Sequence, residues 1–149
     1  MQLQWHDRVF VELTAGQLYA IVALRERVFV VEQSCAFLDA DGLDPGARHL
    51  WAETTGPGPA AIQAYLRIVP AGAKYDEVSL GRIVTAPEAR GTGLGRVLVR
   101  RGLDAVGNTA VRIGAQAHLE RFYGSLGFRR ASEPYLEDGI PHIEMLRAG

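Results

Sequence analysis

The chain has 149 residues, of which 48% are hydrophobic and 22% are charged, and its formal net charge is -1. A chain of this size can bury a core, and its charge balance provides no overall basic field. We therefore expect a single domain over residues 1–149 with no general affinity for nucleic acid. No apolar run approaches the ~20 residues that span a bilayer, and no basic, apolar leader opens the chain. The sequence predicts a soluble, cytoplasmic protein that does not bind membranes. Cys35 is the only cysteine, which excludes an internal disulfide.

The first part of the chain predicts a short strand followed by a helix. Residues 2–6 have the composition of a strand, and Thr14 with Gln17 forms a capping box that starts a helix near Ala15. Apolar residues then recur at helical spacing, while charged residues interrupt any strand-like alternation. We expect this helix to end near Val31.

An acidic turn follows, with Asp39, Asp41 and Asp44 close together. Three carboxylates could attract a cationic substrate, and turn chemistry explains them equally well, because tight loops use Asp, Gly and Pro. A calcium loop would need glycine at its sixth position and glutamate at its twelfth, but counting from Asp39 these positions are Asp44 and Leu50. The pattern therefore disfavours a metal site and leaves the first two interpretations open.

Three strands and a second helix come next. Residues 49–53 and 61–69 are separated by the turn sequence GPGP, which predicts two antiparallel strands, and residues 78–85 add a third. A helix is expected over residues 94–106, with Gly107 as its C-terminal cap.

The last part of the chain predicts a strand over residues 111–116, a helix and two further strands. The helix has one buried stripe at i, i+3 and i+7, made by Leu119, Phe122 and Leu126. Tyr123 lies beside that stripe. Phe128 and residues 142–146 belong to strands on either side of a loop, PYLEDGIP, which His142 is expected to anchor. The order of elements predicts an α/β (α+β) fold, with a mixed, mostly antiparallel sheet, helices on both faces and a β-α-β core.

The segment GRIVTAPEARGTGLGRVL, residues 81–98, leads from an apolar strand through a glycine-rich loop into a helix. Gly91, Gly93 and Gly95 lack a Cβ atom, so consecutive backbone N–H groups can approach one ligand. The unpaired amides and the dipole at the start of the helix favour negative charge. The loop therefore predicts a phosphate site, and a tight turn without a ligand is the alternative.

The spacing of the glycines in this loop narrows the choice of phosphate ligand. A Walker A loop needs GxxxxGK[ST], and the chain has no Gly-Lys pair; a dinucleotide fingerprint needs GxGxxG, which no frame of the loop satisfies. The pattern RxxGxG at Arg90, Gly93 and Gly95 instead resembles the pyrophosphate-binding segment of the GNAT superfamily of N-acetyltransferases. The segment AQAHLERFYGSLGF resembles the tyrosine-bearing helix of the same enzymes. With RERVFVVEQSC and YLEDGIPHIEM, the likeness extends to the ElaA-like branch of GNAT proteins over nearly the whole chain.

This resemblance implies the GNAT fold and acetyl-CoA as acyl donor, with no metal. It implies that the pyrophosphate lies on the loop and that the pantetheine arm lies beside the preceding strand, where Gly81 predicts either a bulge or ordinary close packing. Gln116 stands where many GNAT enzymes have an asparagine that contacts the arm. The expected cofactor-binding residues are Ile83, Val84, Thr85, Arg90, Gly91, Thr92, Gly93, Leu94, Gly95, Arg96, Gln116, Phe122 and Tyr123.

The resemblance also implies a reaction, the transfer of acetyl to a primary amine of a small molecule or peptide, with Tyr123 as the acid that protonates the departing thiolate. The amine must lose a proton, and the candidate bases are Glu32, His49 and Glu53. Glu32 lies near the place where GNAT enzymes admit the acceptor, but an exposed carboxylate at a helix end is the more ordinary explanation. The alternative function is a non-catalytic coenzyme A-binding sensor or regulatory module. A homodimer through outer strands or helices is left open.

Overall fold

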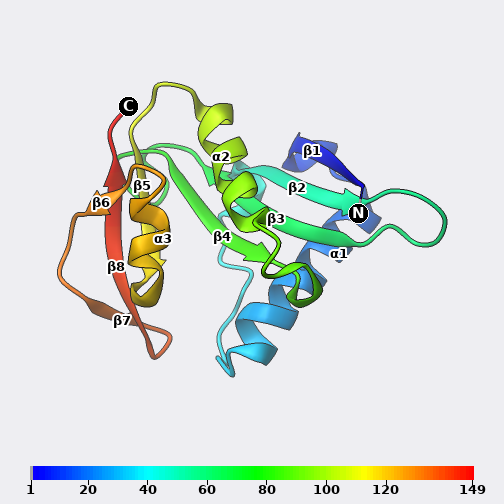
Figure 1. Cartoon of the computed structure of the whole chain (residues 1–149), viewed down its shortest axis with the longest axis horizontal. Coiled ribbons are helices and arrows are strands. Elements are labelled where there is room, and N and C mark those ends of the chain that lie inside the picture. The colour runs from blue at the N-terminus through cyan, green and yellow to red at the C-terminus, as the bar shows by residue number, and fades with distance from the viewer. Residues whose placement is uncertain (1) are drawn as a thin grey trace.

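The structure is a computed structural model that describes residues 2–149 (Figure 1). Its helices and strands come largely in the order that the sequence predicted. The strands are β1 (Leu3–Val9), β2 (Arg48–Thr54), β3 (Ile62–Val69), β4 (Ser79–Thr85), β5 (Val111–Gln116), β6 (Arg129–Arg130), β7 (Tyr135–Glu137) and β8 (Ile140–Arg147). The helices are α1 (Ala15–Arg25), the π-helical η2 (Glu26–Glu32), α2 (Leu94–Val106) and α3 (Glu120–Gly124), with short 3-10 turns η1 (Phe10–Glu12), η3 (Asp44–Gly46), η4 (Pro87–Ala89) and η5 (Ala117–Leu119). None of the helices in this described range has the length and hydropathy that a membrane crossing requires.

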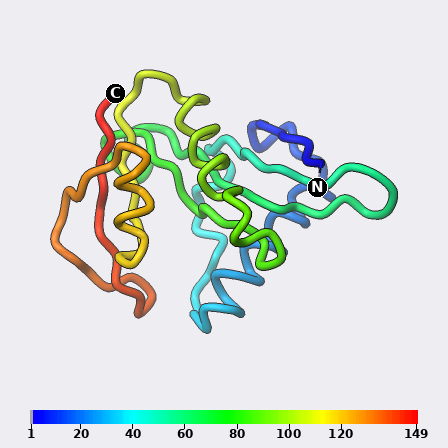
Figure 2. The backbone as a smooth tube through the Cα atoms, viewed as in Figure 1, coloured from blue at the N-terminus to red at the C-terminus, as the bar shows by residue number. Residues whose placement is uncertain are grey.

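The strands form a mixed layer that opens between β4 and β5. The first half is antiparallel in the order β1–β2–β3–β4, and in the second half β8 pairs antiparallel with β5, β6 and β7. A parallel bridge between Val78 and Val111 joins the halves, and next to it the Arg112 N–H donates to the Val78 carbonyl over 2.9 Å. Beyond this bridge β4 and β5 part, as the backbone in Figure 2 shows. The mixed, mostly antiparallel sheet is confirmed, and the opening between its halves is a feature that only the structure reveals.

Helices cover both faces of the sheet, as predicted. One face carries a core shared by α2, α3 and the strands beneath them, with the buried members Leu66, Leu98, Val99, Val111 and Ile143. The other face packs against α1 and η2 through Ile21, Val28, Trp51, Tyr65 and Val84. β3 contributes residues to both cores, which is why it is buried almost throughout, including its two polar side chains, Gln63 and Arg67.

α1 begins where the capping box predicts. The Thr14 hydroxyl accepts a hydrogen bond from the Gln17 N–H, and the Thr14 N–H donates to the Gln17 side-chain oxygen, both over 3.0 Å. The helical path continues to Glu32, but its last seven residues have π-helical hydrogen bonding. π-helical turns often occur at functional sites, and the end of η2 lies at the opening between the two halves of the sheet.

Two C-terminal segments differ from expectation. The helix that carries Tyr123 is short, because a 3-10 turn, η5, precedes the five residues of α3. The segment PYLEDGIP is not a loop: it contains β7 and the start of β8, joined by Asp138 with a φ of 52° and Gly139 with a φ of 77°. An Asp-Gly pair with positive φ at both positions is typical of a two-residue hairpin turn. The prediction of a loop was therefore wrong, although the local signal for the hairpin was in the sequence.

Candidate active site

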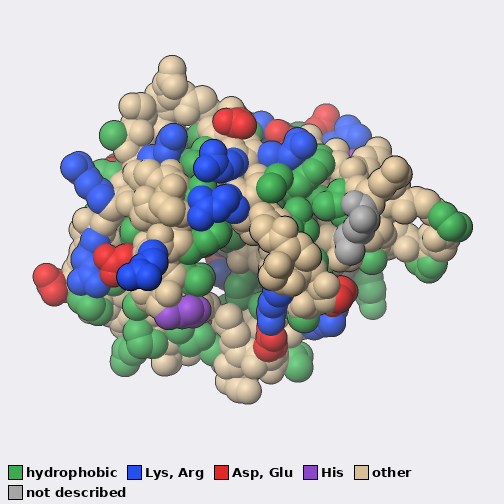
Figure 3. Space-filling model, in the orientation of Figure 1, with side chains coloured by type: hydrophobic (Ala, Val, Ile, Leu, Met, Phe, Trp, Pro, Cys, Tyr) green, Lys and Arg blue, Asp and Glu red, His purple; other side chains and the backbone are tan. Residues whose placement is uncertain are grey.

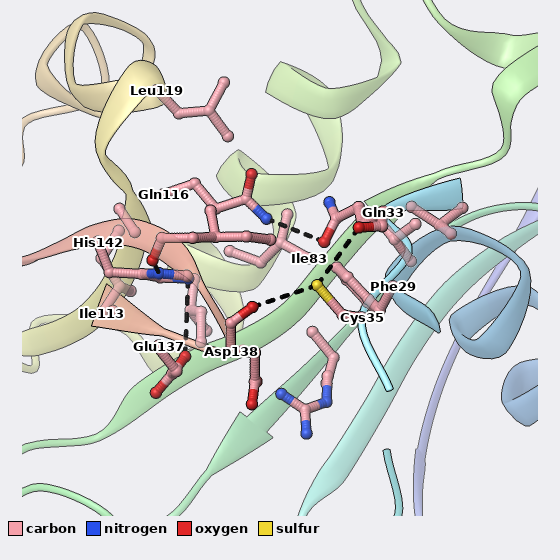
Figure 4. A pocket seen from close by; sticks show the side chains of 18 of the residues that line it. Phe29, Gln33, Cys35, Ile83, Ile113, Gln116, Leu119, Glu137, Asp138 and His142 are labelled. Carbon is pink, nitrogen blue, oxygen red and sulfur yellow. Dashed lines mark hydrogen bonds and ion pairs between the residues drawn. The ribbon is translucent and has the colours of Figure 1, made fainter. Parts of the chain in front are cut away.

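A cavity of about 750 Å³ occupies the opening between β4 and β5 (Figure 4). Its walls come from both strands, from η2 and the loop after it, from η5, and from the β7–β8 hairpin. Cys35 joins two of these walls, because its thiol lies 3.4 Å from the carbonyl oxygen of Asp138 in the hairpin turn. A cavity of this size can hold the end of a cofactor together with a small substrate.

A β-bulge in β4 faces this cavity. In the pairing of β4 with β3, Arg82 and Ile83 together stand opposite a single residue, Leu66. Arg82 has a φ of 47°, which is left-handed and unfavourable for an arginine. The bulge that Gly81 predicted as one of two alternatives is therefore present. A bulge bends its strand, and this bend lies where β4 and β5 part.

A second cavity, of about 330 Å³, lies at the start of α2. Gly93 caps α2 in a left-handed conformation with a φ of 83°, and Gly91 is also left-handed, with a φ of 77°. A Cβ atom at either position would meet nothing within 4 Å, so the space beside both glycines is open. The 13-residue α2 thus presents its unpaired first amides and the positive end of its dipole to an open cavity. This arrangement fits a phosphate group.

Two basic side chains, Arg90 and Arg96, line this second cavity. On the face shown in Figure 3, Lys and Arg side chains gather over α2, which contains Arg96, Arg100 and Arg101. Arg96 donates to the Ser125 hydroxyl over 2.8 Å, and its guanidinium lies 5.7 Å from the centre of the Phe122 ring. The local field at the start of α2 is therefore positive, although the whole chain has a net charge of -1.

The predicted cofactor-binding residues divide between the two cavities. The larger cavity is lined by Ile83, Val84, Thr85, Arg90, Gln116 and Tyr123. The smaller cavity is lined by Gly91, Gly93, Leu94, Gly95, Arg96 and Phe122, and again by Thr85 and Arg90. Because those two residues line both, the cavities adjoin. Thr92 lines neither cavity, and its hydroxyl donates to the Ala89 carbonyl over 2.7 Å within the loop.

The Tyr123 side chain reaches the larger cavity from α3 and is 6% exposed. Its ring meets those of Phe122 and Phe128 edge to face, with centroids 5.1 Å and 5.9 Å away. Burial raises the pKa of Tyr123 above its ordinary value of about 10. The hydroxyl therefore stays protonated at neutral pH, as a proton donor must.

Glu32 lies at the end of η2 and on the wall of the larger cavity. It forms a two-pronged ion pair with Arg90 of the glycine-rich loop, with N···O distances of 2.5 Å and 2.6 Å. The hydrogen bonds from Arg90 lower the pKa of Glu32. A carboxylate with a lowered pKa takes up a proton less readily, so the role of Glu32 as a base stays a prediction.

The other two candidate bases do not line either cavity. His49 is buried between β2 and its neighbours, with Nδ1 2.7 Å from the Tyr65 hydroxyl and Nε2 3.0 Å from the Asp44 carbonyl oxygen. Glu53 pairs with His6 of β1 over 2.7 Å. His49 is therefore a hydrogen-bonded residue of a buried strand, and neither His49 nor Glu53 reaches an acceptor in the larger cavity.

The buried His49 makes stability depend on pH. Burial disfavours the imidazolium and lowers the pKa of His49, so below a pH of about 6.5 the unfolded chain binds a proton that the native chain resists. We expect the free energy of unfolding, measured with urea, to hold above about pH 7 and to fall toward about pH 5. His49→Gln should flatten this decline, and His118→Gln, at an exposed position, should not. An unchanged decline in His49→Gln would contradict the argument.

The acidic turn is part of a network of three aspartates and three arginines. Arg25 pairs with Asp39 (2.8 Å) and Asp44 (2.7 Å), Arg67 pairs with Asp41 (2.6 Å) and Asp44 (2.9 Å), and Arg82 pairs with Asp39 (3.0 Å) and Asp41 (3.3 Å). The network has no excess negative charge, so it offers nothing to a cationic acceptor. Turn chemistry alone does not explain it either. Within residues 2–149, no group of acidic, His or Cys side chains is arranged to hold a metal ion.

This network also supports the bulge in β4. Arg82 is the residue with the left-handed backbone, and its guanidinium is held by Asp39, by Asp41 and over the ring of Phe37 at 5.7 Å. These contacts hold the side chain of Arg82 in place although its backbone has an unfavourable, left-handed conformation. The acidic turn therefore helps to shape the cavity wall from behind.

The fold and the two cavities define a class of protein. A glycine-rich loop at the start of α2 adjoins a cavity that a buried tyrosine lines, between strands that have parted. This arrangement would suit a coenzyme A thioester at a site of group transfer. The model of the GNAT acetyltransferase domain matches residues 60–147. The chain therefore belongs to the GNAT family of acetyltransferases and is an acyltransferase.

Relatives extend this likeness over almost the whole chain. Protein ElaA of Escherichia coli K12 is 39% identical over 97% of this chain and 96% of its own length. The crystal structure of Escherichia coli ElaA has a TM-score of 0.89, covering 98% of this chain and 99% of that one. An acyl-CoA N-acyltransferase from Pseudomonas aeruginosa has a TM-score of 0.91 at 42% identity, covering 99% and 100%. The ElaA-like resemblance and the GNAT fold are thus confirmed.

Proposed function

We propose that this protein, as one domain over residues 1–149, transfers the acetyl group of acetyl-CoA directly to a primary amine of a small molecule or peptide. The observation that carries the proposal is the adjoining pair of cavities, one beside the glycine-rich loop and one containing Tyr123. Their order matches an extended ligand with a phosphate group at one end and a reactive thioester at the other.

The chain's own groups can bind such a ligand along its whole length. The pyrophosphate would lie against the loop from Arg90 to Arg96, where amides and positive charge are available. The pantetheine arm would lie along β4 where β5 has left its edge, because unpaired backbone groups of a strand accept new hydrogen bonds. Gln116 of β5 would face the arm from the other side. Arg90 would exchange its pairing with Glu32 for the phosphate.

Acetyl-CoA, when bound, supplies the thioester whose carbonyl carbon bonds to the amine nitrogen while its bond to sulfur breaks and the electron pair leaves with sulfur. An amide of Ile83 or Val84 in the bulged strand would stabilise the charge that develops on the carbonyl oxygen, a contact that contributes roughly 3 kcal/mol in other enzymes. Tyr123 would donate its proton to the departing sulfur. Glu32 is the base that the sequence offers for the amine.

The binding step is tested by calorimetry with coenzyme A and by release of free thiol from acetyl-CoA with polyamines, lysine peptides and aminoglycosides. We expect Gly93→Ala to weaken coenzyme A binding about tenfold or more, because a Cβ in the left-handed region costs about 1–2 kcal/mol and distorts the loop. Gly72→Ala is the matched control, since Gly72 has a φ of 87°, has no neighbour within 4 Å of its Cβ position and lies outside both cavities.

The two readouts separate the possible failures. If the wild-type protein gives no heat with coenzyme A, or if both alanine variants bind it equally, the glycine-rich loop is not the phosphate site. If coenzyme A binds but no amine of the panel releases thiol, the protein is a coenzyme A sensor and direct transfer is wrong.

A further inference from the structure

The proposed reaction needs a group that removes a proton from the amine, and the larger cavity contains one that the sequence interpretation did not use. Apart from arginines, Tyr123 and His142, its titratable lining side chains are Glu32, Cys35, Lys74, His118, Glu137 and Asp138. His118, Glu137 and Asp138 belong to exposed residues, and Glu32 is paired with Arg90. His142 differs from all of these, because it is an imidazole that is 8% exposed and lines the cavity.

The sheet places His142 beside the expected path of the cofactor arm. His142 of β8 stands directly opposite Gln116 of β5 and opposite Tyr135 of β7. Residues directly opposite in antiparallel strands project to the same face, with Cβ atoms about 5 Å apart. Figure 4 shows the side chains of His142 and Gln116 next to each other at the cavity. Gln116 is the residue expected to contact the pantetheine arm, so His142 lies beside the expected path of that arm, in the cavity that Tyr123 also lines.

The hydrogen bonding of His142 leaves one nitrogen free to act as a base. Nδ1 lies 2.7 Å from the carbonyl oxygen of Ile140. A carbonyl oxygen only accepts, so Nδ1 carries the hydrogen and Nε2 carries the lone pair in the neutral ring. The Tyr135 ring stacks on the imidazole at 5.9 Å between centroids and 27° between planes. The ring is therefore held from two sides, and Nε2 is the nitrogen that carries the lone pair when the ring is neutral.

Glu137 supplies the charge that an imidazolium would need. Its Oε2 lies 3.6 Å from Nε2 of His142, which is longer than a hydrogen bond but close enough to stabilise a positive ring. The Glu137 side chain is 45% exposed and that of His142 is 10% exposed. A proton taken up by Nε2 can therefore leave to solvent by way of Glu137.

We propose that Nε2 of His142 is the general base of the transfer and that Glu137 is its positioning residue, for an acceptor that arrives as an alkylammonium ion. This rests on the proposed function. Nε2 takes one proton from the ammonium, and the amine lone pair then forms the bond to the acetyl carbon while the carbon–sulfur bond breaks. The second proton lost by the nitrogen restores the one that Tyr123 gives to sulfur, and the proton on His142 passes to solvent. The net products are the amide, the free thiol and one proton.

The titratable groups around His142 are few. From β7, Glu137 and the ring of Tyr135 face it. From β5, the facing residue is Gln116, which does not titrate. Across the cavity lie the other titratable lining groups named above, from η2, its following loop, the β3–β4 loop and η5. The pH profile of kcat/KM for a His142 variant can therefore be compared directly with the profiles of Glu137 and Glu32 variants.

The test follows kcat/KM for thiol release from acetyl-CoA between about pH 7.5 and about pH 10, with butylamine, spermidine and Nα-acetyl-lysine amide as acceptors. His142→Asn keeps an N–H that can donate to the Ile140 carbonyl and removes Nε2. We expect a loss of roughly 100-fold at about pH 7.5. The loss should shrink to a few-fold at about pH 10, because an amine with a pKa of about 10.4 is then partly neutral without help. Ionisation of Tyr123 affects both proteins and cancels in their ratio.

Two further variants serve as comparisons. His6→Asn removes a histidine from another His–Glu pair, 2.7 Å long and outside both cavities, and should follow the wild-type profile at every pH. Glu137→Gln changes a half-exposed side chain, so it keeps the test open if His142→Asn does not fold. Its loss of kcat/KM should be larger at about pH 7.5 than at about pH 10, because the imidazolium that forms during transfer loses its neighbouring carboxylate, whereas a purely structural role would give the same loss at both values.

The outcomes separate this proposal from the one on which it rests. If wild-type protein releases no thiol with any amine of the panel, direct transfer itself is wrong and the base has no reaction to serve. If it does release thiol, a His142→Asn loss that is equal at every pH assigns His142 a structural role. If Glu32→Gln shows the pH-dependent loss of kcat/KM and His142→Asn does not, Glu32 is the base. Either of these last two results overturns the assignment of His142.

Discussion

Tyr123→Phe is expected to lower kcat for acetyl transfer by roughly 100-fold or more while leaving the affinity for coenzyme A near that of the wild type. The substitution removes one oxygen and retains the ring that packs against Phe122 and Phe128. The departing thiolate then leaves without a proton from the chain, so the loss falls on the chemical step. The measurement is steady-state thiol release together with calorimetry of coenzyme A binding.

The pH dependence of the wild type gives a second check on Tyr123. Because burial raises the pKa of this phenol above its ordinary value of about 10, its hydroxyl stays protonated through the neutral range. No loss of kcat from this group is expected below about pH 10.

The matched control for Tyr123→Phe is Tyr19→Phe, which removes the same oxygen from a residue that is 79% exposed. Equal kcat values for the two variants would rule out Tyr123 as the acid.

Asp44→Ala is expected to lower the free energy of unfolding by roughly 3–5 kcal/mol. Its Oδ1 bonds both Arg25 (2.7 Å) and Arg67 (2.9 Å), and both arginine side chains are 1% exposed. Removing one partner of a buried ion pair leaves buried charge short of a counter-charge, and here two guanidinium groups lose a partner at once, with Arg25 keeping only Asp39 and Arg67 keeping only Asp41. The measurement is urea unfolding at neutral pH.

A surface pair provides the contrast for Asp44. Asp7 pairs with Arg48 over 2.5 Å, with side chains 37% and 40% exposed, so Asp7→Ala should cost at most about 1 kcal/mol. Burial alone would raise the pKa of Asp44, but the hydrogen bonds from Arg25 and Arg67 outweigh it and lower that pKa. The stabilisation is therefore present above about pH 4 and is lost as the pH falls below it. A cost for Asp44→Ala as small as that for Asp7→Ala would show that the network does not hold the fold.

Local signals in the sequence predicted most of the fold and the position of the glycine-rich loop before α2. The capping box at Thr14 starts α1, and the bounds of α2 and β5 are those expected, because these elements depend on residues only a few positions apart. The glycine-rich loop was recognisable for the same reason, since left-handed backbone before a helix requires glycine at fixed spacing. The hairpin at Asp138 and Gly139 carried an equally local signal that the loop interpretation missed.

Only the tertiary structure decided how the acidic and basic residues of this chain are used. Asp41 meets Arg67 across 26 residues and Arg90 meets Glu32 across 58, so no local pattern could show that these charges are neutralised. The sheet register places His142 opposite Gln116, and so brings a buried imidazole to the cavity. The physical reason is the range of the interactions. Backbone conformation and capping are set by neighbours along the chain, whereas the pairing of charges and the parting of β4 from β5 depend on which distant segments pack together.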